Sequence, residues 1–88
     1  MPRPPARQPD RPALISHLRG ILATCPQKRA VLGLLLLGLG EKQIAHRLGI
    51  SRHTVHGHLR ELYGRLGLHD RISLALLARD AIAGSTPT

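Results

Sequence analysis

The feature that most constrains this chain is the stretch over residues 38–71, which has the pattern of two helices joined by a tight turn. Gly49 interrupts the helical period, and glycine most easily adopts the left-handed conformation that ends a helix. Ser51 follows two residues later and is a typical N-terminal cap, whose hydroxyl accepts a hydrogen bond from a free amide of the first turn. The sequence therefore predicts a short helix over 41–48 and a longer helix over 51–66.

The longer of these two helices has two unlike faces. An apolar stripe recurs at the helical period and predicts the side that faces the core. The opposite side carries imidazoles, an arginine and two glycines, with no acidic residue among them. Such a face suits a polyanion that comes close to the helix backbone, and we expect this helix to lie in the major groove of DNA. The stripe consists of Val55, Leu59, Leu62, Tyr63 and Leu66, and the opposite face of His53, His56, Gly57, Arg60 and Gly64.

Composition and charge narrow the class of protein. The 88 residues allow one domain with a small aliphatic core, because the chain has one Tyr and no Phe or Trp. The scarcity of aromatic rings argues against recognition of single-stranded nucleic acid by base stacking. With 13 Lys and Arg against 5 Asp and Glu, the formal charge is +8, which favours nucleic acid or an anionic surface as partner.

Cysteine usage and hydropathy indicate the compartment. Cys25 is the single cysteine of the sequence, so no intramolecular disulfide forms, and a reducing cytosol is expected. The first eleven residues lack the apolar segment of a signal peptide, and the apolar run over 31–39 is about half the length that spans a bilayer. We therefore expect a cytoplasmic protein with no membrane partner.

Helical periodicity continues through the rest of the chain, and no strand pattern occurs, so the predicted fold class is all-α. Residues 1–11 are rich in proline and arginine and predict a disordered basic tail. Residues 12–24 predict an N-terminal helix whose apolar stripe packs on the following domain or pairs with another copy. The domain itself is expected over residues 25–84, and residues 85–88 are expected to be a disordered end.

The residue string of the two-helix stretch closely resembles the DNA-binding domain of LuxR/NarL-type response regulators and their small stand-alone relatives. The resemblance covers roughly residues 26–83. The C-terminal domain of sigma factors shares a similar core, but the segment over 65–71 and the apolar helix after it favour the LuxR type. The matching signature is Gly38, Lys42, Ile44-Ala45, Leu48-Gly49-Ile50-Ser51, Thr54-Val55, His58-Leu59, Leu66-Gly67 and Asp70-Arg71.

The resemblance implies a four-helix helix-turn-helix domain, here with an extra N-terminal helix and without a receiver or ligand-binding domain. It implies sequence-specific binding of double-stranded DNA by a homodimeric transcriptional regulator, with the last helix pairing two subunits. Carried over by position, the DNA base contacts are His56, Gly57 and Arg60, with His53 on the same face. The phosphate contacts are Lys42, Ser51, Arg52, Thr54, His58 and Arg65, and the dimer contacts are Leu74, Leu77, Ala78 and Ala81.

Three residues depart from the family pattern. His56 stands where the family usually has Lys, and an imidazole carries only a fraction of a positive charge at neutral pH. Gly57 has no side chain to read a base and lowers helix propensity by about 1 kcal/mol. Lys28 stands where the family usually has an acidic residue at the start of the first helix of the domain. An acidic residue there interacts favourably with the positive end of the helix dipole, and Lys28 removes that interaction. These departures predict weaker or less selective DNA binding. His56 and Gly57 also motivate an alternative: a protein-interaction module that pairs with another regulator through its last helix and binds DNA weakly or not at all.

Enzymatic and metal-dependent functions find little support in the sequence. The spacing of His53, His56 and His58 invites a metal hypothesis, but on a helix His58 points well away from the other two. No paired carboxylates occur, and Cys25 has no matched base. We therefore expect no metal, no cofactor, no small-molecule substrate and no catalytic residue.

Overall fold

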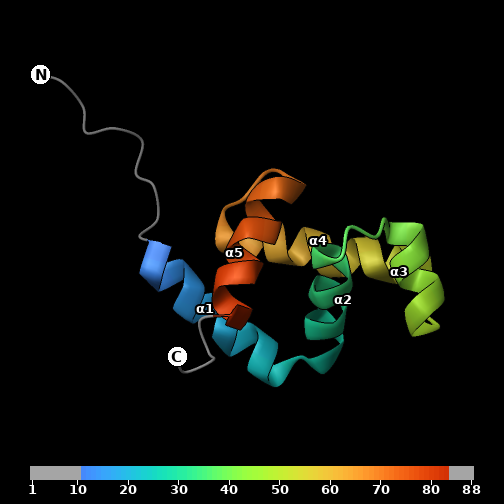
Figure 1. Cartoon of the computed structure of the whole chain (residues 1–88), viewed down its shortest axis with the longest axis horizontal. Helices are drawn as coiled ribbons and strands as arrows, with labels where there is room; N and C mark the ends of the chain where they lie inside the picture. The colour runs from blue at the N-terminus through green and yellow to red at the C-terminus, as the bar shows by residue number, and fades with distance from the viewer. Residues whose placement is uncertain (1–10, 84–88) are drawn as a thin grey trace, which may run out of the picture.

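The computed structural model describes residues 11–83, which form five α-helices and no strand (Figure 1). The all-α prediction is confirmed, and Arg11, which we expected in the tail, is the first residue of a helix. The predicted tail and the predicted disordered end lie outside the described residues. None of the helices in the described part is long and apolar enough to cross a membrane. The helices are α1 Arg11–Thr24, α2 Pro26–Leu36, α3 Glu41–Leu48, α4 Arg52–Leu66 and α5 Arg71–Ala83.

The turn between α3 and α4 has the predicted chemistry. Gly49 adopts the left-handed conformation at φ 67°, and the hydroxyl of Ser51 accepts a hydrogen bond from the Thr54 amide at 3.0 Å. Gly67 ends α4 in the same left-handed conformation, also at φ 67°. The carboxylate of Asp70 then caps α5 by accepting an amide hydrogen bond at 3.1 Å. These local devices fix where α4 begins and ends, and so which of its residues share a face.

Helix α2 lies at the centre of the domain and contacts each of the other four helices. Its position agrees with its sequence, because a helix that is apolar nearly all round is stable only when neighbours cover it. Helix α1 lies side by side with α5, and α3 lies at the other end of the domain against α4 (Figure 1). The core is aliphatic and consists of Leu18, Ile21, Leu22, Val31, Leu32, Leu35, Ile44, Ala45, Val55, Leu59, Leu62, Leu66, Leu74, Leu77, Ala78 and Ala81.

The face of α5 that we expected to pair two subunits lies inside this core. Its four side chains are at most 2% exposed, because α1 and α2 pack over them. In this packing they cannot contact a second subunit, so the structure does not support their assignment as dimer contacts. The apolar side chains that α5 does expose are Ile72, at 70%, and Leu76, at 44%. The buried residues concerned are Leu74, Leu77, Ala78 and Ala81.

Candidate nucleic-acid interface

The four residues predicted to contact DNA bases lie together on the solvent-facing side of α4. They follow the helical period, and each is exposed, because the opposite side of the helix is buried in the core. A Cβ atom added at either glycine of this face would meet nothing within 4 Å, so the surface there is open down to the helix backbone. The face consists of His53, His56, Gly57, Arg60 and Gly64.

Arg60, the arginine of this face, is free to bind another molecule. Within residues 11–83 its guanidinium forms no hydrogen bond and no ion pair, and its side chain is exposed. A guanidinium presents several N–H donors in a planar fork, which matches the two acceptors on the major-groove edge of guanine. Arg60 is therefore available for bidentate contact without breaking an existing interaction.

The residues of this face of α4 include no acid, but the packing of α3 against α4 places one beside it. Glu41, in the first turn of α3, has its Oε2 3.3 Å from Nδ1 of His56. Its Oε1 lies 4.0 Å from Nε of Arg52. No local sequence pattern indicates this contact, because Glu41 and His56 are 15 positions apart. A carboxylate thus borders both a predicted base contact and a predicted phosphate contact.

The predicted phosphate contacts fall into two groups. Ser51, Arg52 and Thr54 lie together at the start of α4, and Lys42 is exposed in the first turn of α3. The hydroxyls of Ser51 and Thr54 are already joined at 2.8 Å within the helix cap. Exposed amides, hydroxyls and cations at a helix N-terminus are the groups that commonly hold a phosphate.

The second group consists of His58, which faces α2, and Arg65, which faces α1. Nε2 of His58 is 2.8 Å from Oε1 of Gln27, so this imidazole links α4 to α2. Burial lowers the pKa of His58, the positive charge of Lys28 lowers it further, and Glu61 opposes both effects. A neutral imidazole that is already hydrogen-bonded is a poor phosphate ligand, and in this packing His58 serves as a structural contact.

An ion pair that the sequence did not reveal accompanies His58. The ammonium of Lys28 is 3.2 Å from Oε1 of Glu61, and Lys28 is buried although it is charged. Its hydrogen bond to the Glu61 carboxylate holds the pKa of that carboxyl below its usual value. Glu61 also binds Arg65, whose Nε is 3.3 Å from Oε2. The charge of Lys28 is therefore neutralised by Glu61 on α4, and no local sequence pattern predicts this pair.

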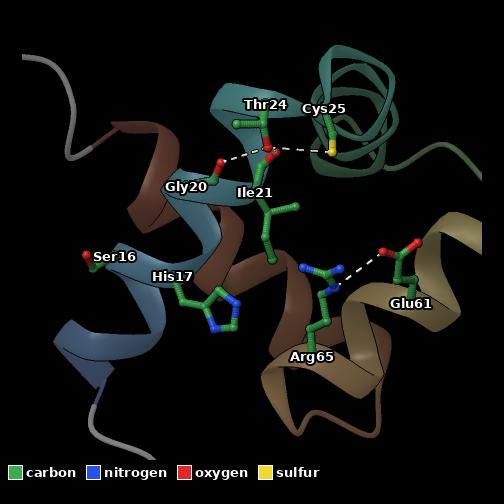
Figure 2. A pocket seen from close by; sticks show the side chains of 8 residues that line it. All are labelled: Ser16, His17, Gly20, Ile21, Thr24, Cys25, Glu61 and Arg65. Carbon is green, nitrogen blue, oxygen red and sulfur yellow. Dashed lines mark hydrogen bonds and ion pairs between the residues drawn. The ribbon is translucent and has the colours of Figure 1, made fainter.

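A hollow of about 330 Å³ lies between α1 and α4, on the flank that Arg65 occupies. Figure 2 shows the side chains of His17 and Arg65 pointing into the same space, with Thr24 and Cys25 at its rim. Cys25 caps α2 through its backbone alone, and its sulfur lies 3.7 Å from the Thr24 hydroxyl. Among residues 11–83 no three His, Cys, Asp or Glu side chains come together as a metal site would require. Arg65 thus lies apart from the exposed face of α4 that carries Arg60.

Comparison with known proteins agrees with this architecture. The chain is 43% identical over 56 residues to a Mycobacterium bovis protein whose name describes an HTH-type transcriptional regulator, covering 64% of this chain and 6% of the relative. It is 35% identical over 75 residues to the DNA-binding transcriptional activator DevR/DosR of Mycobacterium tuberculosis, covering 77% of this chain and 35% of the relative. It is also 43% identical over 44 residues to the Fimbriae Z protein of Escherichia coli, covering 50% of this chain and 21% of the relative.

The chain therefore spans between a twentieth and about a third of the length of these relatives. No solved structure gives a significant match. The model of the luxR family of bacterial regulatory proteins matches residues 25–78, which include α2, α3, α4 and the first half of α5. The family is one of regulatory proteins, and the names of the Mycobacterium bovis and Mycobacterium tuberculosis relatives describe transcriptional regulation. The chain belongs to the LuxR family of bacterial regulatory proteins.

Proposed function

We propose that this protein binds double-stranded DNA in the cytoplasm and regulates transcription, with α4 in the major groove. The observation that carries the proposal is the exposed face of α4, where His53, His56, Gly57 and Arg60 stand in one row at helical period. Membership of the LuxR family supports it, as does the similarity to a relative named as a DNA-binding transcriptional activator.

The charge distribution suits a duplex in two respects. The formal charge of +8 supplies a long-range attraction to the phosphates, and cations that neutralise phosphates release counterions on binding. Lys42 and Arg52 are exposed beside the start of α4, where they can contact the backbone on either side of the groove that α4 enters. In this proposal affinity comes mainly from those contacts, and specificity comes mainly from Arg60.

A gel-shift titration with random duplex DNA at low salt tests the proposal directly. Binding that weakens steeply as salt increases is the expected result, because each phosphate contact adds about −0.9 to the slope of log K against log salt concentration. Selection of bound duplexes from a random pool then tests whether the binding is sequence-specific. Failure to bind random duplex DNA at low salt would refute the proposal.

We propose further that the protein acts as a homodimer through the exposed part of α5. Ile72 and Leu76 are one turn apart and exposed, whereas large apolar side chains are usually covered. Two copies related by a two-fold axis would present the same strip to each other and would place two α4 helices on two half-sites. Sedimentation equilibrium over a range of protein concentrations measures this association.

The second candidate function is pairing with another regulator through the same strip, with DNA binding that is weak or absent. Gly57, which cannot read a base with a side chain, and the bond between His56 and Glu41 are the observations that favour it. The low-salt gel shift separates the two candidates, since only the first requires the isolated protein to bind DNA.

A further inference from the structure

The contact between α3 and α4 points to a role for Glu41 that goes beyond the family fold. We propose that Glu41 holds the ring proton of His56 on Nδ1 and thereby presents Nε2 as a hydrogen-bond acceptor to an amino group on a DNA base. Glu41 is a positioning residue in this proposal, which rests on the proposed DNA-binding function. It sets which bases His56 can read.

The direction of the hydrogen bond fixes the position of the proton. The Oε2 atom of Glu41 lies 3.3 Å from Nδ1 of His56, and an ionised carboxylate can only accept. Nδ1 must therefore carry the proton that the bond uses. A neutral imidazole has one N–H, so Nε2 is left with a lone pair and acts as an acceptor.

The surroundings leave Nε2 free to use that lone pair outside the domain. Within the part of the chain that the structure describes, His56 makes no bond other than the one to Glu41. Its side chain is 52% exposed, and it lies on the face of α4 proposed to enter the groove. Nε2 is therefore the ring nitrogen available to DNA.

Arg52, the second cation near Glu41, does not compete strongly for its carboxylate. Nε of Arg52 is 4.0 Å from Oε1, which is beyond hydrogen-bond distance, and the Arg52 side chain is 71% exposed. The Glu41 side chain is only 25% exposed, so it has little freedom to turn away from His56. The hydrogen bond to His56 is thus shorter than the contact between Glu41 and Arg52.

The proton position selects a class of base. In the major groove cytosine N4 and adenine N6 are amino donors, whereas guanine presents the acceptors N7 and O6. An accepting Nε2 matches cytosine or adenine. A ring protonated on Nε2, the form that a neutral histidine mainly adopts in water, would instead match guanine. Glu41 therefore favours cytosine or adenine opposite His56.

Nitrogen NMR of the histidine rings tests the first half of the proposal without DNA. The full chain is labelled with ¹⁵N and measured in a buffer alkaline enough to keep exposed imidazoles neutral, and the ring signals lost in His56→Gln identify His56. We expect the Nδ1–H form in the native protein and a shift towards the Nε2–H form in Glu41→Ala. A native His56 that carries its proton on Nε2 would overturn the proposal.

Selection from a random duplex pool tests the second half. The native protein should enrich adenine or cytosine at one position by about fivefold, which corresponds to one net hydrogen bond, and Glu41→Ala should lose that enrichment or shift it to guanine. Asp80→Ala removes the same charge on α5, away from α4, and should keep the native preference. Identical preferences in the native protein and Glu41→Ala would overturn the specificity role while DNA binding itself stood. If the native protein binds no duplex at all, the proposed function fails and base reading by His56 fails with it, whereas the NMR result still decides the role of Glu41 towards the ring.

Discussion

Replacing Arg60 by Ala is the sharpest test of how this protein would read DNA. Arg60 is exposed, and its guanidinium has no partner within residues 11–83, so its removal breaks no contact of the free protein. The thermal stability should therefore change little, since a surface substitution of this kind is usually worth within about 0.5 kcal/mol. A loss of DNA binding in Arg60→Ala can then be attributed to the complex.

The magnitude follows from the contact that a free guanidinium can make. A bidentate bond to guanine discriminates by about 1–3 kcal/mol, so Arg60→Ala should raise the dissociation constant on the selected site by about 5- to 150-fold. The salt dependence should stay close to that of the native protein, because a base contact releases few counterions. In a selection experiment one guanine position should become degenerate.

Fluorescence anisotropy with the selected duplex and with a scrambled duplex, each over a range of salt concentrations, gives both quantities. Arg29→Ala is the matched control. Arg29 is an exposed arginine of α2, and it lines a hollow with residues of α1 and α5 and with none of α4. It removes the same charge and should weaken binding to both duplexes alike. Equal losses on the selected and scrambled duplexes in Arg60→Ala, with a salt slope reduced by about 0.9, would show that Arg60 binds phosphate and would refute base reading.

Three further predictions concern α4 and α5. Gly57→Ala should stabilise the domain by about 0.5–1 kcal/mol in chemical denaturation, because the added methyl meets open space within a helix, and it should weaken DNA binding if the groove needs close approach at this point. Ile72→Glu should lower self-association in sedimentation experiments without lowering stability, since Ile72 is exposed; unchanged association would exclude this strip as the dimer contact. The pKa of His58 is lowered in the folded protein, so as the pH falls below the ordinary value of 6.5 the unfolded chain takes up a proton more readily than the folded chain. The contribution of His58 to the free energy of unfolding is therefore fully present above that pH and is lost as the pH falls through the folded-state pKa. Denaturant midpoints measured between about pH 7 and pH 5.5 should therefore fall more in the native protein than in His58→Gln.

Local sequence signals predicted the fold well because each acts over a few residues. The hydroxyl of Ser51 and the left-handed glycines at 49 and 67 determine helix ends by themselves, whatever the rest of the chain does. The exposed face of α4 followed from the same logic, since the helical period alone places His53 and Arg60 on one side. These are properties of a single helix and its caps.

The contacts that could not be predicted all join different helices. Glu41 meets His56, and Lys28 meets Glu61, only because α3, α2 and α4 cross at particular angles and distances. The same limit explains the dimer residues. The apolar face of α5 predicted by the sequence is real, but the sequence does not say that α1 covers it. An apolar stripe shows that a helix needs a neighbour, and it does not identify the neighbour.

The cover that α1 provides decides how a second subunit could reach α5. Leu18, Ile21 and Leu22 are at most 6% exposed, and burial of three such side chains contributes roughly 5–9 kcal/mol before the entropy of ordering the helix is subtracted. The Arg11–Asp80 ion pair and the hydrogen bond from Nε of Arg19 to the Ala81 carbonyl, at 3.1 Å, also hold α1 on α5. Small domains have net stabilities of about 5–15 kcal/mol, so detaching α1 would remove much of the stability of the fold. A dimer that forms through α5 should therefore leave α1 in place and use the exposed strip at Ile72.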